Sequence, residues 1–233
     1  MKIRDKINLD KDGLTKYGPI NIVALGDSIT HGMFKGSEID YEAVYWNRLR
    51  KKIYEIKSYV PVNVINAGIG GATAKTAVDR VDSQVLIHKP DLITICFGLN
   101  DLCESLDVFI SSLGEIFKKC KDSGAEVIYM TPNMLNTYIA EDILPCDKEY
   151  AKTTCEWQNS GKMDLFMEKA CECAKSFGVE ICDCYSKWKK LSMSQDTTIL
   201  LANRVNHPTR EMHELFAQSL FDMIFSDETK NIK

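Results

Sequence analysis

Four short segments of this sequence contain the residue types that acyl transfer requires. The reaction needs a nucleophilic hydroxyl, a base that takes its proton, and hydrogen-bond donors around the oxyanion that develops. A serine, a run of glycines, an asparagine and a histidine are available for these roles. They occur in "GDSIT" (26–30), "NAGIGGAT" (66–73), "GLND" (98–101) and "NRVNHPT" (203–209).

Each segment also has a simpler structural explanation. A serine after a strand-ending glycine often caps a helix or turn, and glycines in a loop often serve a tight turn. Asn100 with Asp101 is a common turn or cap pair, and His207 before a proline is also typical of a residue that precedes a helix. The presence of all four segments in one chain favours the catalytic interpretation, because each supplies a different part of one reaction.

Hydrophobic periodicity predicts the elements that must position these segments. Short β-branched runs predict strands, and apolar residues spaced three and four apart predict helices between them. Apolar strands that alternate with amphipathic helices indicate a parallel sheet covered on both faces, a doubly wound α/β sandwich. The predicted strands cover 20–25, 62–67, 91–97, 125–131 and 179–183, and the helical patterns cover 45–56, 74–85, 106–120 and 166–177.

Glycine and proline mark several boundaries of these elements. Gly124 and Gly178 fall where helix C-caps belong, and Pro208 suits the first turn of the final helix. Residues 132–158 form the longest irregular stretch, which predicts a functional lid or rim, or a pair of short elements. Ligands of open parallel sheets bind beyond the carboxyl ends of the strands, where we expect the loops after the first three strands to meet.

Composition limits the class of protein. A chain of 233 residues with 45% hydrophobic content predicts one domain with a sizeable core. The net charge of -4 and the absence of a basic stripe argue against nucleic acid as a partner. Residues 1–18 alternate charges, unlike a secretion signal, and no apolar stretch approaches the ~18 residues that span a bilayer. We therefore expect a soluble, cytoplasmic protein with no membrane span.

The nine cysteines favour reduced thiols over disulfides. Their number is odd, and many of them sit inside apolar-periodic segments, as buried thiols do. Two C-x-C pairs, Cys171 with Cys173 and Cys182 with Cys184, do not match the usual C-x2-4-C spacing of structural zinc sites. We predict no metal site.

The four segments, in this order and spread over most of the chain, resemble the conserved blocks of the GDSL, or SGNH, hydrolase family. The resemblance implies a flavodoxin-like α/β/α sandwich, in agreement with the periodicity. It implies a single domain over residues 1–233, with 1–18 as an N-terminal extension. Members of the family are esterases, lipases, lysophospholipases, thioesterases and carbohydrate deacetylases, and the resemblance implies no metal or organic cofactor.

The resemblance also assigns roles to individual residues. Ser28 would be the nucleophile, and its own backbone N–H would be one oxyanion donor. The family's Asn-x-x-x-x-Gly pattern makes Gly71 the second donor through its N–H, and the side-chain amide of Asn100 would be the third. His207 would be the general base that later protonates the leaving alcohol.

The sequence departs from the family at the residue that normally orients the histidine. An Asp usually lies three residues before it, whereas Arg204 occupies that position here. In serine proteases, exchange of the corresponding Asp for Asn costs ~10^4 in turnover because the wrong tautomer results. We favour a Ser–His dyad in which a backbone carbonyl or Asn203 orients the imidazole. A distant acid, Asp183 or Asp196, is the alternative, and low activity is a third outcome.

The three other histidines are weaker candidates for the base. His31 lies three residues after Ser28, where its side chain would struggle to face the hydroxyl and the oxyanion donors together. His213 is expected to be a surface or packing residue, and His88 suits the negative end of a helix dipole.

Other function classes fit the sequence less well. A phosphate loop in "GIGGATAKT" (68–76) would need a glycine in place of Ala74 before Lys75, and a dinucleotide fingerprint would need one in place of Thr73. Arg204, at the position of the usual acid, suggests a family relative that binds an ester or glycan without cleaving it. An acyltransferase would use the same Ser28 chemistry with an alcohol as acceptor in place of water.

We predict a serine esterase acting on short acyl esters. The substrate is expected to be a small molecule or a glycan, for example an acetylated sugar or a lysophospholipid-like ester. Phe34, Leu135 and Tyr138 are candidates for a modest acyl pocket.

Overall fold

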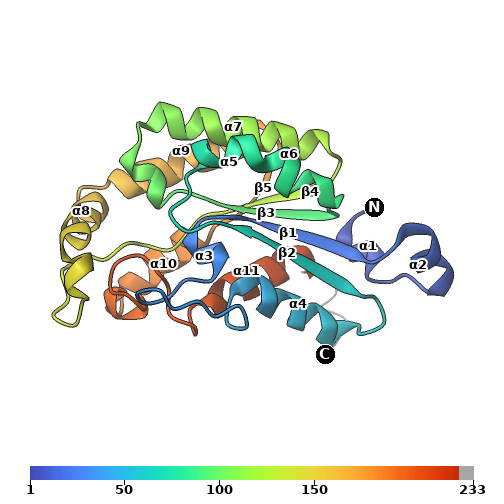
Figure 1. Cartoon of the computed structure of the whole chain (residues 1–233), viewed down its shortest axis with the longest axis horizontal. Helices are drawn as coiled ribbons and strands as arrows, with labels where there is room; N and C mark the ends of the chain where they lie inside the picture. The colour runs from blue at the N-terminus through green and yellow to red at the C-terminus, as the bar shows by residue number, and fades with distance from the viewer. Residues whose placement is uncertain (226–233) are drawn as a thin grey trace.

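A five-stranded parallel sheet forms the centre of the computed structural model, which describes residues 1–225 (Figure 1). The strand order is β2-β1-β3-β4-β5, which is the flavodoxin-like order and confirms the predicted fold class. Each strand boundary lies within one residue of its predicted position. The strands are β1 (Ile20–Gly26), β2 (Val62–Gly68), β3 (Leu92–Cys96), β4 (Glu126–Met130) and β5 (Glu180–Cys182).

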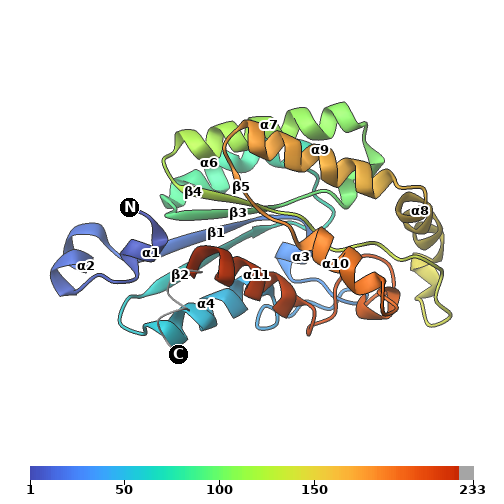
Figure 2. The same ribbon diagram turned by 180° about the vertical axis from the view of Figure 1, so that it is seen from behind.

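Helices cover both faces of the sheet, as the apolar stripes predict (Figures 1 and 2). One face carries α5 (Ala74–Ala77), α6 (Val81–Gln84), α7 (Leu106–Asp122) and α9 (Lys162–Ser176). The other carries α4 (Tyr45–Ile56), α10 (Cys184–Ser192) and α11 (His213–Phe225). Short 3-10 helices also occur at η1 (Val78–Arg80), η2 (Leu86–His88), η3 (Asn100–Cys103), η4 (Pro145–Asp147) and η5 (Thr198–Leu200).

The apolar stripes of these helices pack onto the buried strands. All five residues of β3 are buried, as expected for a central strand with helices on both sides. Gly124 and Gly178 follow α7 and α9 with φ of +80° and +62°, so both predicted C-caps are confirmed. Across residues 1–225, every helix is too short or too polar to span a bilayer.

The final helix begins five residues later than predicted. α11 starts at His213, whereas Pro208 pairs with Leu201 in an antiparallel β-bridge. The Ala202 N–H donates to the His207 carbonyl at 2.7 Å in the same bridge. Residues 200–209 therefore turn back on themselves, and Pro208 belongs to this turn rather than to a helix.

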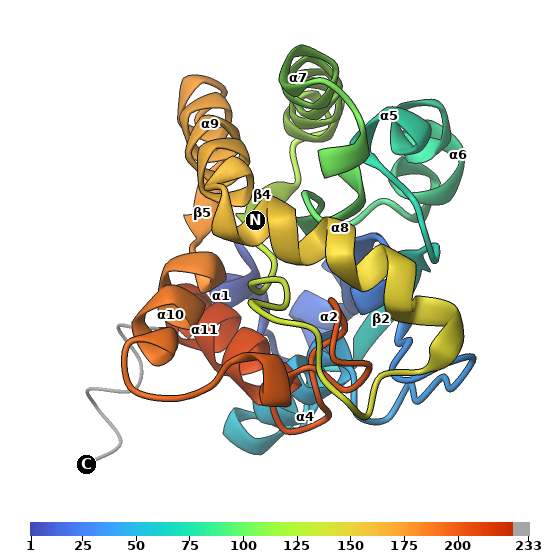
Figure 3. The ribbon, with the colours of Figure 1, turned by 90° about the vertical axis from the view of Figure 1, so that its left-hand side faces the viewer.

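The irregular stretch 132–158 contains two short elements, which was one of the two expected outcomes. They are η4 and α8 (Lys148–Asn159), and α8 lies beyond the carboxyl ends of the strands, at the end of the molecule that Figure 3 shows. The Leu135 N–H donates to Gln158 Oε1 at 2.9 Å, and Asn136 Nδ2 donates to the Ala151 carbonyl at 3.0 Å. These bonds tie α8 to the segment that follows β4.

The first eighteen residues form α1 (Ile3–Lys6) and α2 (Lys11–Tyr17) at the opposite end of the sheet (Figure 1). Ile3 and Ile7 are fully buried in the main core. Lys6 Nζ forms an ion pair with Asp91 at 2.8 Å. The segment before β1 is therefore packed against the sheet through α1.

Candidate active site

Ser28 is the first residue of α3 (Ser28–His31), directly beyond the end of β1. Asp27 precedes it as the N-cap, and its Oδ1 accepts a hydrogen bond from the Ile29 N–H at 2.9 Å. The sharp change from strand to helix places the hydroxyl at the carboxyl end of the sheet. The residue that caps the N-terminus of α3 is therefore Asp27 and not Ser28.

Gly68 lets α3 lie directly on the end of β2. A Cβ at this position would overlap with the backbone of Thr30 and His31. Gly68 pairs with Gly26 across the sheet, so the ends of β1 and β2 lie side by side under α3. A Cβ at Gly26 would likewise overlap with the Thr30 side chain and the Cys96 carbonyl, so the glycines of two of the four segments allow this close approach.

His207 reaches Ser28 across 179 residues of sequence. Its Nε2 lies 2.9 Å from Ser28 Oγ, and its Nδ1 lies 2.6 Å from the carbonyl oxygen of Phe34. A carbonyl oxygen only accepts hydrogen bonds, so Nδ1 must carry the proton. In the neutral ring Nε2 is then the acceptor, and the Ser28 hydroxyl donates to it. This tautomer is the one that a general base for Ser28 requires.

Burial lowers the pKa of His207, and the hydrogen bond to Phe34 opposes that effect in part. The imidazole is therefore neutral at neutral pH and able to accept a proton. This protonation state follows from desolvation of the ring, which disfavours its charged form.

Asn203 does not orient the imidazole, contrary to one of the two expectations for the dyad. Its Oδ1 accepts from three backbone N–H groups, those of Val205, Asn206 and His207, at 3.0–3.1 Å. It therefore shapes the turn that presents the histidine, while the Phe34 carbonyl contacts the ring. Of the two groups expected to orient the imidazole, the backbone carbonyl is the one that the structure places at His207 Nδ1.

The acids considered as alternatives lie in other interactions. Arg204, at the position of the usual acid, pairs with Asp142 at 3.0 Å. Asp183 is the N-cap of α10, and Asp196 accepts from the Tyr138 hydroxyl at 2.6 Å. Neither Asp183 nor Asp196 contacts the imidazole, so the structure favours the dyad over a displaced triad.

Three hydrogen-bond donors lie at the ends of β1, β2 and β3. Asn100 Nδ2 donates to the Ala72 carbonyl at 3.0 Å, which uses one of its two N–H groups. Gly71 has φ of +76°, and apart from Gly71 and its two chain neighbours no residue has an atom within 4 Å of the position that a Cβ would take, so its backbone borders open space. Among residues 1–225, the structure shows no acceptor for the N–H groups of Gly71 and Ser28.

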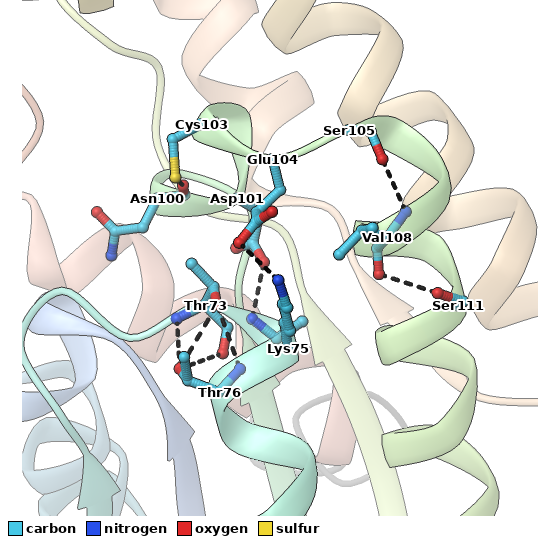
Figure 4. A network of polar contacts seen from close by, with 11 residues as sticks. Thr73, Lys75, Thr76, Asn100, Asp101, Cys103, Glu104, Ser105, Val108 and Ser111 are labelled. Atoms are coloured by element: carbon cyan, nitrogen blue, oxygen red, sulfur yellow. Dashed lines mark hydrogen bonds and ion pairs between the residues drawn. The ribbon is translucent and has the colours of Figure 1, made fainter.

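Asp101 connects two of the loops that carry these donors (Figure 4). Its two carboxylate oxygens accept from the Ala74 N–H at 2.7 Å and from the Gly98 N–H at 2.9 Å. Thr73 and Thr76 form a capping box at the start of α5 beside this contact. Burial raises the pKa of Asp101 to about 6. The loop after β2 and the turn after β3 are therefore held together by one carboxyl group.

Asp27 is a second buried carboxyl at the site. Burial raises its pKa to about 7, and the nearby charge of Asp101 adds to the shift. Its Oδ2 has no hydrogen-bond partner within the described part of the chain. At neutral pH the group is therefore partly protonated, directly beside Ser28 in the chain.

The other three histidines do not contact Ser28 Oγ. His31 Nδ1 accepts from the Gly70 N–H at 3.3 Å. His213 is fully buried, which lowers its pKa to about 3, and its Nδ1 accepts from the Tyr45 N–H at 3.2 Å. His88 ends η2. His213 is thus a packing residue, which was one of the two expectations for it.

Two of the three residues predicted for an acyl pocket are buried in the protein. Phe34 and Leu135 have no exposed surface, and the Tyr138 hydroxyl donates to Asp196 at the surface. The prediction of an acyl pocket lined by these side chains is therefore wrong. Sequence reasoning proposed a backbone carbonyl at the imidazole but did not identify its residue, Phe34, because a main-chain group has no side-chain signature.

No metal site is present among the described residues. Within 1–225, no group of three or more His, Cys, Asp or Glu is arranged to hold a metal ion. All nine cysteines are free thiols, of which Cys103 and Cys146 are exposed. The buried thiols are Cys96, Cys120, Cys173, Cys182 and Cys184, and Cys155 and Cys171 are partly buried.

Ser28 and His207 are in hydrogen-bond contact at the carboxyl end of a flavodoxin-like sheet, the arrangement that a serine hydrolase would need. The chain belongs to the GDSL-like lipase/acylhydrolase family, whose model matches residues 24–215. The resemblance inferred from the four segments is therefore confirmed.

Curated relatives match part of the chain. An arylesterase of Vibrio mimicus is 30% identical over 111 residues, which are 47% of this chain and 52% of the relative. The uncharacterized lipoprotein YqeF of Bacillus subtilis (strain 168) is 36% identical over 89 residues, 38% of this chain and 35% of the relative. The chain thus spans about half or less of the length of these relatives.

Solved structures match nearly the whole chain. Axe2, an acetylxylan esterase from Geobacillus stearothermophilus, aligns with a TM-score of 0.68 and 19% identity, covering 88% of this chain and 94% of Axe2. LAE5, an α/β hydrolase from the metagenome of Lake Arreo in Spain, aligns with a TM-score of 0.68 and 17% identity over the same shares. These similarities confirm the α/β/α fold.

Proposed function

We propose that this protein is a serine esterase that forms an acyl-enzyme on Ser28. The observation that carries the proposal is the pair of contacts made by His207, with the serine hydroxyl at 2.9 Å on one side and the Phe34 carbonyl at 2.6 Å on the other. Membership in the GDSL-like lipase/acylhydrolase family supports the same reaction class.

The first half of the proposed reaction acylates the serine. Ser28 Oγ attacks the ester carbonyl while His207 Nε2 takes the hydroxyl proton, and the carbonyl oxygen becomes an oxyanion. The N–H groups of Ser28 and Gly71 and the free amide N–H of Asn100 stabilise this charge. The C–O bond to the alcohol then breaks, and His207 gives its proton to the departing alkoxide oxygen.

The second half releases the acid. A water molecule attacks the acyl-enzyme while His207 Nε2 takes one of its protons, and the proton returns to Ser28 Oγ when the acyl C–O bond breaks. The imidazolium exists only between these transfers. The Phe34 carbonyl stabilises the imidazolium through its dipole, at the place where a carboxylate usually supplies a full negative charge.

Loss of the nucleophile is the direct test of this proposal. We expect Ser28→Ala and His207→Ala to lower kcat on p-nitrophenyl acetate by at least about 10^4, because the two side chains act as a unit. Ser111→Ala, which removes an exposed hydroxyl on α7, serves as the matched control and keeps wild-type activity. The measurement is a panel of p-nitrophenyl esters from acetate to palmitate.

Two results of this panel would contradict the proposal. Turnover that survives Ser28→Ala unchanged would remove the nucleophile, and no turnover of any ester by the wild type would favour a binding function. A preference for palmitate over acetate would contradict the short-acyl assignment alone.

We further propose that the alcohol part of the substrate is a sugar. A recess of about 300 Å³ adjoins α3 and the end of β2. Its lining comprises the aromatic rings of Tyr41 and Trp46, with His31, Asn66 and Gly68. Aromatic rings beside polar groups in one recess suit a sugar ring, and the fold neighbour Axe2 is an acetylxylan esterase.

Tyr41 gives a test of the sugar assignment, because half of its surface is exposed. We expect Tyr41→Ala to raise KM for an acetylated xylo-oligosaccharide by about fivefold and to leave p-nitrophenyl acetate kinetics unchanged, since one lost stacking contact is worth about 1 kcal/mol. Tyr54→Ala, an exposed tyrosine on α4, is the control. Equal effects of Tyr41→Ala on both substrates would show that the residue is structural and would refute the sugar recess.

A further inference from the structure

Arg210 links the segment that carries His207 to the loop that carries the Phe34 carbonyl. Its Nε donates to Asp40 Oδ2 at 2.8 Å, and its Nη2 donates to Glu38 Oε1 at 2.6 Å. The guanidinium carbon also lies 4.6 Å from the centroid of the Phe34 ring. One side chain, three residues after His207, therefore contacts this loop in three places.

The loop between α3 and α4 is closed on itself around Phe34. Met33 and Ile39 form an antiparallel bridge, and the Phe34 N–H donates to the Glu38 carbonyl at 2.9 Å. Because the loop is closed in this way, holding the side chains of Glu38 and Asp40 also restrains the main chain at Phe34.

The Phe34 ring also packs against His213. It is fully buried, and its centroid lies 5.2 Å from that of His213 at an interplanar angle of 57°. The ring of Phe34 thus contacts both the Arg210 guanidinium and the His213 imidazole. The neutral, desolvated His213 contributes packing rather than charge to this arrangement.

We propose that Arg210 is a positioning residue for catalysis, which holds the Phe34 carbonyl at His207 Nδ1 through Asp40 and Glu38. The inference rests on the proposed Ser28–His207 mechanism. In a site without an acid on the histidine, the acceptor is a main-chain atom, and its position depends on what fixes the loop. Because Arg210 follows His207 in the chain and pairs with the loop of Phe34, it fixes the His207 ring and the Phe34 carbonyl relative to each other.

A positioning role can be separated from a structural one because these ion pairs are partly exposed. The side chains of Arg210 and Glu38 are 39% and 50% exposed. Such pairs contribute little to stability, whereas the alignment of a general base strongly affects turnover. The Arg210 hydrogen bond also lowers the pKa of Asp40, so that carboxylate stays ionised under mildly acidic conditions.

The first experiment compares two arginines on the same segment. We expect Arg210→Gln to lower kcat by about tenfold or more with KM nearly unchanged, a smaller loss than the ~10^4 caused by a wrong tautomer. Arg210→Lys should recover part of the loss, because it keeps the charge but not the fork of donors. Arg204→Gln is the comparison for disturbance of the segment itself, because it removes the ion pair to Asp142 and the Nη1 hydrogen bonds to the Ile199 and Leu201 carbonyls but no contact with the loop of Phe34.

The outcomes of this comparison are distinct. An unchanged kcat in Arg210→Gln would overturn the proposal, and so would an equal loss in Arg204→Gln, which would indicate general disturbance of the segment. A large fall in thermal midpoint together with the fall in kcat would assign Arg210 a structural role instead.

A double-mutant cycle tests whether Arg210 acts through the loop. Asp40→Asn should lower kcat in the same way as Arg210→Gln, and the double variant should lose little more than either single variant. Losses that multiply in the double variant would show that the two residues act independently, which contradicts the proposed link.

A spectroscopic readout tests the link without relying on turnover. The short bond from His207 Nδ1 to the Phe34 carbonyl predicts a downfield ring N–H proton resonance in the wild type, absent from His207→Ala. We expect Arg210→Gln to shift this resonance upfield or broaden it, and Arg204→Gln to leave it in place. Retention of the wild-type resonance in Arg210→Gln would refute the positioning role, even if the protein hydrolyses no ester.

Discussion

At the scale of single residues, burial sets the protonation states of the site. Burial lowers the pKa of the His207 imidazole and raises that of the Asp27 carboxyl to about 7. Both shifts have the same cause, since each group loses hydration of its charged form. Near neutral pH the site thus holds a neutral base and a partly protonated acid close to one serine hydroxyl.

These shifts predict the pH dependence of hydrolysis. The proposed reaction needs neutral His207, so we expect activity to be lost as pH falls through the lowered pKa of that ring. We therefore expect the acid limb of kcat/KM below the ordinary histidine value of about 6.5. The measurement is kcat/KM for p-nitrophenyl acetate against pH in the wild type and in Asp27→Asn.

Asp27→Asn identifies the group responsible for each limb. A limb near the Asp27 pKa of about 7 that disappears in this variant belongs to Asp27, and the limb that remains belongs to His207. A remaining limb clearly above the ordinary histidine value would contradict the neutral, desolvated imidazole.

At the scale of elements, α3 depends on how closely it approaches the strand ends. Gly68 leaves no room for a side chain, since a Cβ there would meet the backbone of α3 rather than a movable side chain. The position of the serine therefore depends on a glycine that is distant in the sequence. The turn at 200–209 is likewise held by main-chain bonds and by the side chains of Asn203 and Arg204.

Gly68→Ala tests this dependence. We expect a loss of about 2–3 kcal/mol in the free energy of unfolding, from backbone overlap, and a fall in kcat because Ser28 moves with α3. Gly124→Ala is the control, since its φ of +80° predicts a cost of about 1 kcal/mol, far from the site and in open space. Urea unfolding and ester hydrolysis measure the two effects. Wild-type kcat in Gly68→Ala would show that α3 tolerates the displacement.

At the scale of the whole molecule, the strand order assembles the site. β1 lies between β2 and β3, so the loops that carry Ser28, Gly71 and Asn100 leave the sheet side by side. The turn that carries His207 follows η5 and returns to the same end of the sheet. α1 and α2 lie at the opposite end, away from this chemistry (Figure 1).

The amino-acid sequence alone was enough to predict the strands, whose order periodicity left open, and the two side chains of the Ser28–His207 contact. The strands follow from a local pattern, because a strand covered by helices on both faces requires a continuous apolar run. The helix C-caps also follow from a local pattern, because the positive φ at these positions favours glycine. Ser28, Asn100 and His207 carry side chains whose chemistry is visible in their identity. The boundary at Pro208 was misplaced, because proline suits a β-bridge as well as a first helical turn.

Only the folded chain decided which group faces His207 Nδ1. A carbonyl oxygen is present in every residue, so nothing in the identity of Phe34 indicates that its carbonyl receives the imidazole N–H. The choice arises from the closed loop at 33–40 and from Arg210, which reaches Asp40 in that loop across 170 positions of sequence. Contacts over such a separation depend on the packing of the whole chain, and no local pattern of residues records them.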